Sequence, residues 1–227
     1  MRYSLLAMTI VSGCGAPRAE AGPDSSRELH PVAHDALCVT KGAITKGAIT
    51  EPTVRAFATG SHGEAAQLAF TFGGDSDSVR GLASGQVRRQ LGLKLRAADS
   101  CNVVYVMWRL DPKPKLEVSV KRNAGMHTHD QCGANGYQKV KPSHAAALPA
   151  LDAGASHLLR AEIRGDDLYA WIDGSLAWQG RLPEEARELA GPAGLRTDNV
   201  KLDQLELAAP AGDGRGPVCK RHEDQEE

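Results

Sequence analysis

The sequence predicts an all-β domain of antiparallel strands, and three observations support this fold class. Apolar side chains occupy every second position in "RQLGLKLRA" (Arg89–Ala97) and "KLEVSVK" (Lys115–Lys121), and "CNVVYVMWRL" (Cys101–Leu110) is a β-branched and aromatic run. Turn-forming residues separate these runs, including the two prolines of "DPKP" at Asp111–Pro114. Only "PEEARELAG", Pro183–Gly191, has helical signals, with proline first and glycine last.

Length and charge set the broad class of protein. A chain of 227 residues with 41% hydrophobic residues can bury one good core, so we expect a single domain with tails. The formal net charge of -1 gives no overall attraction for nucleic acid, which we do not expect as a partner. Residues 88–141 are nevertheless basic, with eleven Lys and Arg against four Asp and Glu. We interpret them as solvated strand faces that acidic strands neutralise, with a polyanion site as the alternative.

The first fourteen residues have the features of an export signal. Arg2 is positively charged, Leu5–Val11 is an apolar run too short to span a bilayer, and two small residues precede Cys14. This order resembles the lipobox of bacterial lipoproteins, which implies removal of residues 1–13 and acylation of Cys14. Two or three acyl chains anchor durably, because each buried methylene contributes about 0.8 kcal/mol. An ordinary secretory signal with Cys14 incidental is the alternative.

We therefore expect an exported bacterial lipoprotein, held at a membrane on its periplasmic or cell-surface face. Residues 14–36 are small, polar and proline-containing, which is typical of a flexible tether. Residues 37–209 would form the β-sandwich domain. Residues 210–227 would be a C-terminal tail pinned through Cys219.

The acidic residues between Leu159 and Gly180 are predicted to make turns rather than a catalytic cluster. Asp173-Gly174 lies between apolar strands and is a strong two-residue hairpin signal, because both central residues need a positive φ. Gly165-Asp166 interrupts the alternation in the same way. Glu162 is the exception, because it would project from a strand face between two arginines.

This segment and "GPAGLRTDNVKLDQLEL" together resemble the C-terminal half of concanavalin A-like lectin and glucanase domains of the laminin-G-like type. The resemblance implies a two-sheet antiparallel jelly-roll sandwich with one short helix, whose concave sheet in relatives accepts saccharide or peptide. Fold alone does not confer function, so the ligand is an analogy. The matching positions are Gly165-Asp166, Asp173-Gly174, Gly191, Gly194-Leu195 and Asp203.

Four cysteines remain if Cys14 carries lipid, and four cysteines allow three pairings in an oxidising compartment. We favour Cys101–Cys132, which would close one strand-loop-strand excursion. The second pair would then be Cys38–Cys219, which would tie the two ends of the domain together as jelly rolls do.

No sequence motif predicts catalysis, a cofactor or a metal. Glucanases of this type carry Glu-x-Asp-x-x-Glu on one strand, and Glu-x-Asp does not occur in this chain. A hydrolase with separated acids such as Glu117 and Glu162 is the alternative. We interpret Asp75-Ser76-Asp77 as a polar turn, with calcium binding as the alternative. We interpret His127–Asp130 as a loop tip rather than a zinc or copper site.

Strand parity suggests which residues could bind a ligand. If Val104, Val106 and Trp108 face the core, then Tyr105 and Arg109 face outward on a polar sheet face. A plain solvated face is the alternative reading of this surface. The predicted ligand-binding residues are Lys94, Arg96, Tyr105, Arg109, Lys121, Asn123, Tyr137, Arg160 and Glu162.

These observations predict a non-catalytic, lectin-like binding module that is anchored in the bacterial envelope and recognises a carbohydrate or envelope polysaccharide. The first alternative is a structural or protein-interaction lipoprotein that binds no glycan. The second is an enzyme similar to glycoside hydrolases, with atypical acids.

Overall fold

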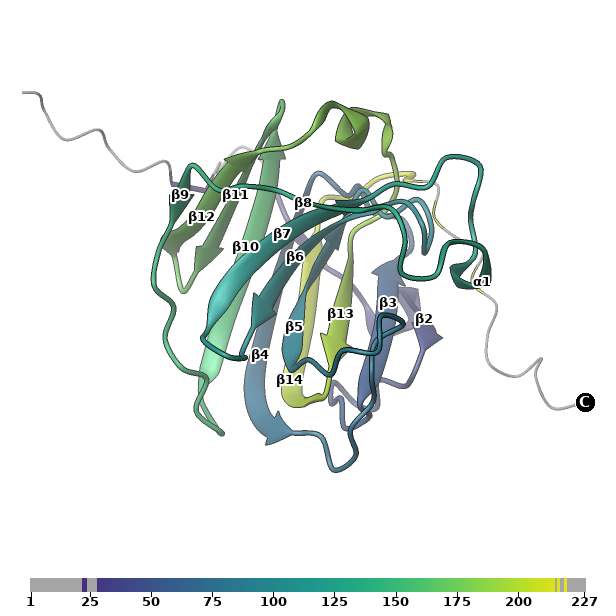
Figure 1. Cartoon of the computed structure of the whole chain (residues 1–227). Helices are drawn as coiled ribbons and strands as arrows, with labels where there is room; N and C mark the ends of the chain where they lie inside the picture. Colours follow the sequence, from purple (N-terminus) through teal and green to yellow (C-terminus); the bar gives the residue numbers. More distant parts are fainter. Residues whose placement is uncertain (1–21, 24–27, 215, 217–218, 220–227) are drawn as a thin grey trace, which may run out of the picture.

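The computed structural model describes residues 22–23, 28–214, 216 and 219 (Figure 1). The predicted signal peptide, Cys14 and most of the predicted tether lie outside these residues. The described part of the predicted tether already joins the fold, because His30–Pro31 pairs with the strand that ends at Ala209. The sandwich therefore begins before residue 37, where we had placed its start. Among the described residues, no helix has the length and apolar content needed to cross a membrane.

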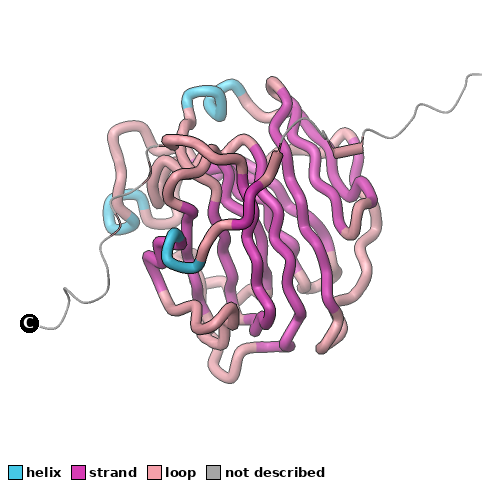
Figure 2. Tube along the Cα trace, turned by 180° about the vertical axis from the view of Figure 1, so that it is seen from behind, coloured by secondary structure: helices cyan, strands magenta, loops and turns pink. Residues whose placement is uncertain are grey.

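The chain forms two antiparallel seven-stranded sheets, which confirms the predicted all-β sandwich (Figure 1). Strands dominate the trace, and the helices are short segments in the loops (Figure 2). Sheet A runs in the order β1 (His30–Pro31), β14 (Val200–Ala209), β4 (Ala65–Asp75), β10 (Ser156–Arg164), β11 (Asp167–Ile172), β12 (Ser175–Arg181) and β9 (His144–Ala145). Sheet B runs in the order β2 (Leu37–Lys41), β3 (Thr53–Ala58), β13 (Gly194–Asp198), β5 (Gln90–Leu95), β6 (Val103–Arg109), β7 (Lys115–Lys121) and β8 (Tyr137–Lys139).

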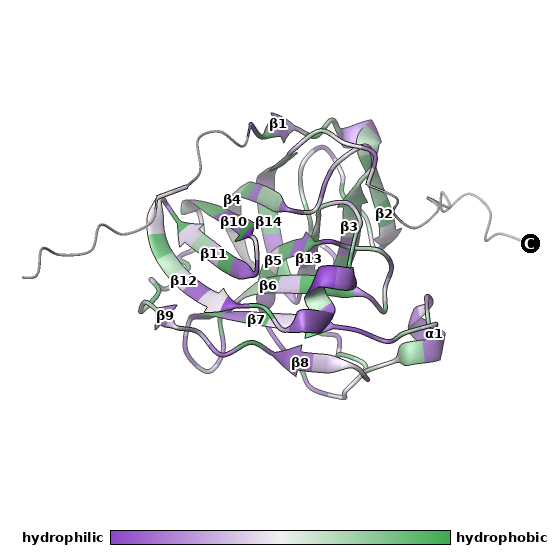
Figure 3. Cartoon of the chain, turned by 90° about the horizontal axis from the view of Figure 1, so that it is seen from above, coloured by the Kyte–Doolittle hydropathy of each residue, from purple (hydrophilic) through white to green (hydrophobic). Residues whose placement is uncertain are grey.

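The core lies between the sheets and follows the predicted alternation. Val104, Val106 and Trp108 of β6 are fully buried in it, as strand parity predicted. Trp108 meets the ring of Phe70 from sheet A edge-on, with 6.3 Å between ring centroids. Large aromatic side chains contribute most to such a core, because each removes a large apolar area from water. At the margin of sheet B, β8 carries mainly hydrophilic residues (Figure 3).

Residues with a positive φ form the turns that connect the strands, at the positions that the sequence indicated for two of these turns. Asp173 and Gly174 adopt φ values of 51° and 83° and join β11 to β12 in a two-residue hairpin. Gly165, at φ 61°, begins the turn between β10 and β11. Asn199, at φ 56°, makes the sharp passage from β13 in sheet B to β14 in sheet A. Its side chain bonds the backbone of Arg80 and Arg88, which fixes the loop between β4 and β5.

The helices differ from the prediction. Residues 183–191 contain a short 3-10 helix, η2 (Glu184–Glu188), and a second one, η1, spans His34–Ala36. The α-helix of the described chain is α1 (His129–Cys132), where we expected a loop tip. Thr128 and Gln131 cap its first turn reciprocally, and this short-range signal was missed.

Both favoured disulfides are present. Cys101 pairs with Cys132, and Cys38 pairs with Cys219 across a sequence separation of 181 residues. The second bond attaches the C-terminal tail to β2 of sheet B, as predicted. Loops of this length restrict the unfolded chain most strongly in the entropic account of disulfide stabilisation.

Candidate binding cleft

A cleft of about 830 Å³ lies over the outward face of sheet B. Its floor comes from alternate residues of β3, β13, β5, β6 and β7, and its rim from the loops at residues 81–86 and 127–134. Clefts of this size suit a small ligand or a few units of a polymer. The strand register aligns one row of neighbouring residues across this face, which consists of Phe57, Gly194, Lys94, Tyr105, Ser119 and Lys139. The next row contains Arg55, Arg196, Gly92, Met107 and Glu117.

Two arginines share one buried carboxylate in the floor. Asp198 is 1% exposed, and its Oδ1 accepts a hydrogen bond from Arg55 Nη2 at 2.6 Å. Its Oδ2 accepts from Arg196 Nε at 2.9 Å and from Gln90 Nε2 at 2.6 Å. These bonds fix both guanidinium planes, because a charge-assisted pair is strong and directional.

Lys94 lies beside the arginines, and no carboxylate of the described residues pairs with it. Its side chain is buried, and the hydrogen bond it makes to a described residue is a long one of 3.4 Å to the Ala56 carbonyl. Burial, assisted by the charges of Arg55 and Arg196, lowers the pKa of Lys94 to about 7. We call Arg55, Lys94 and Arg196 the cationic floor.

Two stacked tyrosines lie beside the cationic floor. The rings of Tyr105 and Tyr137 are 6.0 Å apart at an interplanar angle of 24°. The guanidinium carbon of Arg196 is 5.1 Å from the Tyr105 centroid, within cation–π range. Burial raises the pKa of Tyr105 to about 12, so its hydroxyl stays protonated at neutral pH. Tyr105 is buried, so the half-exposed ring of Tyr137 is the aromatic surface that the pair presents to the cleft.

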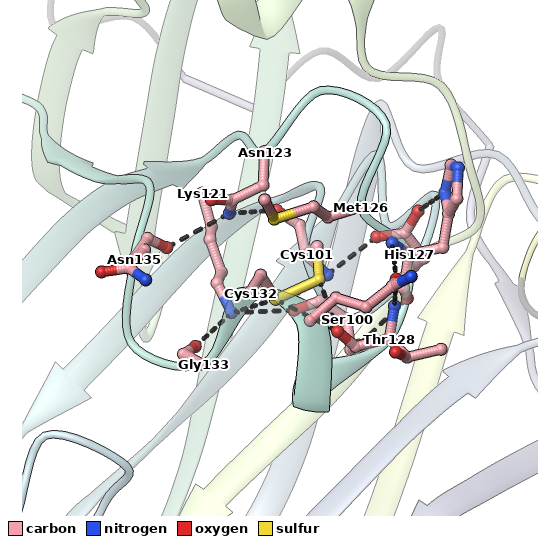
Figure 4. Close-up of a disulfide and its surroundings, with 12 residues drawn as sticks. Ser100, Cys101, Lys121, Asn123, Met126, His127, Thr128, Cys132, Gly133 and Asn135 are labelled. Atoms are coloured by element: carbon pink, nitrogen blue, oxygen red, sulfur yellow. Dashed lines mark hydrogen bonds and ion pairs between the residues drawn. A yellow bond between two sulfur atoms is a disulfide. The ribbon is translucent and has the colours of Figure 1, made fainter.

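The Cys101–Cys132 disulfide and Lys121 hold the rim (Figure 4). Lys121 Nζ donates to the carbonyls of Ser100 and Gly133, at 3.2 Å and 2.8 Å, and lies 3.1 Å from Cys132 Sγ. The ammonium therefore connects the end of β7 to both halves of the disulfide loop. His127 Nδ1 lies 2.8 Å from a carboxylate oxygen of Asp99 on the same rim.

The structure brings four of the predicted ligand residues together in this cleft, namely Lys94, Tyr105, Lys121 and Tyr137. Asn123 lies close by and has a structural position, because its amide donates to the carbonyls of Cys101 and Asn135. The ligand-binding role of each of these residues stays a prediction.

Two predicted arginines lie outside the group of cleft-lining residues. Arg109 donates to Glu117 at 2.9 Å at one end of the cleft. Arg96 makes two hydrogen bonds of 2.8 Å to the carboxylate of Glu64 and a third to the Ala186 carbonyl. Both side chains are therefore engaged within the protein.

The prediction that Arg160 and Glu162 share this face is wrong. They belong to β10, which pairs with β4 and β11 in sheet A on the opposite side of the sandwich. Glu162 is fully buried there and accepts hydrogen bonds from Arg160 and Arg164. Alternation correctly gave the outward direction of these side chains but could not tell which sheet would hold the strand.

Sequence reasoning missed Arg55, Arg196 and Asp198. Each lies at an alternate position opposite buried neighbours, as in "GLRTDN", where Leu195 faces the core. This alternation could be read from the sequence, but the pairing of β13 with β3 and β5 could not. In the segment Asp75–Asp77, which we interpreted as a polar turn, Asp75 pairs with Arg89 and Asp77 pairs with Lys201.

No protein-family model matches this sequence, and no curated protein matches it. Among solved structures, the carbohydrate-binding module CBM66 from Bacillus subtilis is 12% identical, over 78% of this chain and 94% of that one, with a TM-score of 0.49. The Caenorhabditis elegans galectin LEC-6 is 10% identical, over 74% and 98%, with a TM-score of 0.40. The Crh5 transglycosylase is 12% identical, over 82% and 85%, with a TM-score of 0.45. We assign the fold from the strand order of this chain. Structural similarity at these identities and TM-scores does not assign a function.

Lys94 should make the stability of the fold depend on pH. The unfolded chain keeps the Lys94 proton to about pH 10, whereas the folded chain releases it above about pH 7, so raising the pH favours folding. Between pH 7 and 9, urea unfolding should show the wild type gaining about 2 kcal/mol relative to Lys94→Met. Lys139→Met, which changes an exposed lysine of the same cleft, should keep the wild-type slope. Equal slopes for wild type and Lys94→Met would contradict the assignment.

Proposed function

We propose that this protein is a non-catalytic binding module that holds a saccharide in the cleft of sheet B. The observation that carries the proposal is the combination of the Tyr105–Tyr137 pair with fixed planar polar groups on one cleft floor. Sugar rings present apolar C–H faces that pack on aromatic rings, and hydroxyl edges that bond amides, carboxylates and guanidinium groups. Arg196 supplies such a group beside the tyrosines, and Asp198, which Gln90 also bonds, fixes its guanidinium plane.

The lowered pKa of Glu117 supports a non-catalytic role. Burial raises the pKa of Glu117, but the charges and hydrogen bonds of Arg109, Lys115 and Lys139 outweigh this, so its net pKa is lowered. A glycosidase acid needs a raised pKa to protonate the leaving group. Glu162 lies in the other sheet, so it cannot act with Glu117 on one glycosidic bond.

The proposed site of action is the bacterial envelope, with the protein attached through lipid on Cys14. The lipobox-like order of residues before Cys14 supports the anchor. The two disulfides support an oxidising compartment, because such bonds persist there and are rare in the cytosol.

Removal of one cleft tyrosine should weaken saccharide binding selectively. We expect Tyr137→Ala, a change on an edge strand at a half-exposed ring, to lower the affinity for any glycan that binds the full chain by about 10-fold. The matched control is Tyr169→Ala, which removes a stacked tyrosine from sheet A and should leave the affinity unchanged. A glycan array followed by calorimetry on the hits provides both measurements.

Three results would contradict saccharide binding in this cleft. The first is an array with no glycan bound, which would favour the structural or protein-interaction alternative. The second is an equal loss of affinity in both tyrosine variants. The third is turnover of a bound glycan that Glu117→Gln abolishes, because that result would make the protein an enzyme.

The anchor has an independent test. Mass spectrometry of the mature protein should show Cys14 as the first residue with diacylglycerol attached, and Cys14→Ala should move the protein from the membrane fraction to the soluble fraction. An unacylated mature N-terminus would contradict the anchor and would leave the cleft proposal standing.

A further inference from the structure

The cationic floor has more positive charge than the described residues balance. Among the described residues, Asp198 is the carboxylate that bonds its arginines, and Arg55 and Arg196 share it. Lys94 adds a third positive charge when protonated, and no carboxylate oxygen of the described chain lies in ion-pair range of its Nζ. A charge removed from water without a partner is costly, so this arrangement would be stabilised by an anion.

The open donors of the floor point to where that anion would lie. Arg55 directs its Nη1 at the Val54 and Thr197 carbonyls and its Nη2 at Asp198, so both of its terminal nitrogens already bond the protein. Arg196 uses Nε for Asp198 and Nη1 for the Tyr137 hydroxyl, and its Nη2 bonds no described residue. Lys94 has one long bond for three N–H groups. Arg196 Nη2 and Lys94 Nζ are therefore the available donors, and both residues line the cleft.

We propose that the saccharide of the proposed function is acidic, and that Lys94 and Arg196 together bind the carboxylate of a hexuronate unit. This inference rests on the proposed function, because the tyrosine pair must hold the sugar ring while the two cations hold its carboxylate. Two donors from different strands match the two oxygens of a carboxylate, and the exposed ring of Tyr137 lies next to Arg196, whose Nη1 donates to its hydroxyl.

A carboxylate in this position would change the protonation of Lys94. An added anion favours the charged ammonium, so it raises the pKa of Lys94 from its lowered value, and binding above pH 7 takes up a proton. Well below pH 7, Lys94 is already charged and little proton is taken up. Besides burial, the charges that lower the pKa of Lys94 are those of Arg55 and Arg196. The charged and titratable groups that line the cleft with it are Lys41, Arg55, Arg88, Asp99, Tyr105, Glu117, Lys121, His127, His129, Asp130, Tyr137, Lys139, Arg196 and Asp198.

The test uses pairs of oligosaccharides that differ only in charge. Tetrasaccharides of galacturonate, mannuronate, guluronate and hyaluronan are each compared with their carboxyl-reduced counterparts in calorimetric titrations of the full chain. We expect at least one acidic member to bind 10-fold or more tightly than its neutral counterpart at pH 6.5. This preference should fall as the pH rises from 7 to 8.5. Titrations at pH 8 in two buffers of different ionisation enthalpy should show proton uptake.

Variants assign the preference to the cationic floor. Lys94→Met keeps the unbranched apolar stem of the side chain and removes its charge, so the ratio of acidic to neutral affinity should fall about 10-fold and proton uptake should disappear. Lys201→Met is the matched control, because Lys201 pairs with Asp77 in sheet A outside the cleft and should leave both quantities unchanged. Hydrogen exchange of the free variants reports whether each is folded.

The outcomes separate the two proposals. Equal binding of acidic and neutral members would overturn the acidic specificity and leave saccharide binding intact. No binding of any member, and none on a full glycan array, would overturn both. Binding of poly-L-glutamate as tight as that of the best uronate would overturn the assignment to a saccharide, because it would show an acidic peptide as the partner. An acidic preference that survives in Lys94→Met would overturn the role of this lysine.

Discussion

Side-chain alternation across the antiparallel register of sheet B determines both the core and the cleft. Leu93, Val106 and Leu195 face one way and pack against sheet A, so the intervening residues Lys94, Tyr105 and Arg196 must face the other way. A shift of one residue in the register would exchange these two sets and would place the cations in the core. The apolar face therefore fixes the position of the polar face.

The same constraint allows the protein to hold costly groups close together. Burying an ammonium beside two guanidinium groups opposes folding, and the structure retains this arrangement because the strands below it are fixed by a fully buried core. Asp198 offsets part of the repulsion by bonding both arginines, and Gln90 fixes the orientation of that carboxylate. The remaining imbalance is confined to Lys94 and the open edge of Arg196. Unfavourable groups that a rigid scaffold maintains are typical of binding sites.

The sequence was sufficient for the local features and insufficient for the long-range ones. Period-two alternation and Asp173-Gly174 gave the strands and a hairpin, because both depend on neighbouring residues. Strand adjacency was not available, which is why β10 was assigned to the wrong sheet and why Arg196 was overlooked. The buried tyrosine of β6 was found because its strand is long and its parity is unambiguous. The distance from β6 to Tyr137 could be established only from the folded chain.

We infer that the buried ammonium of Lys94 lacks a carboxylate counter-ion among the described residues of the free protein. This inference is tested most directly by the pH titration of its side chain, followed by NMR of Lys-selectively labelled protein with Lys94→Met used for assignment. The Lys94 signal should titrate near pH 7, in keeping with its lowered pKa of about 7, and its midpoint should move to higher pH when the cleft is filled with the best acidic saccharide. Titration of Lys94 near its ordinary value of about 10.4 in the free protein would contradict the account.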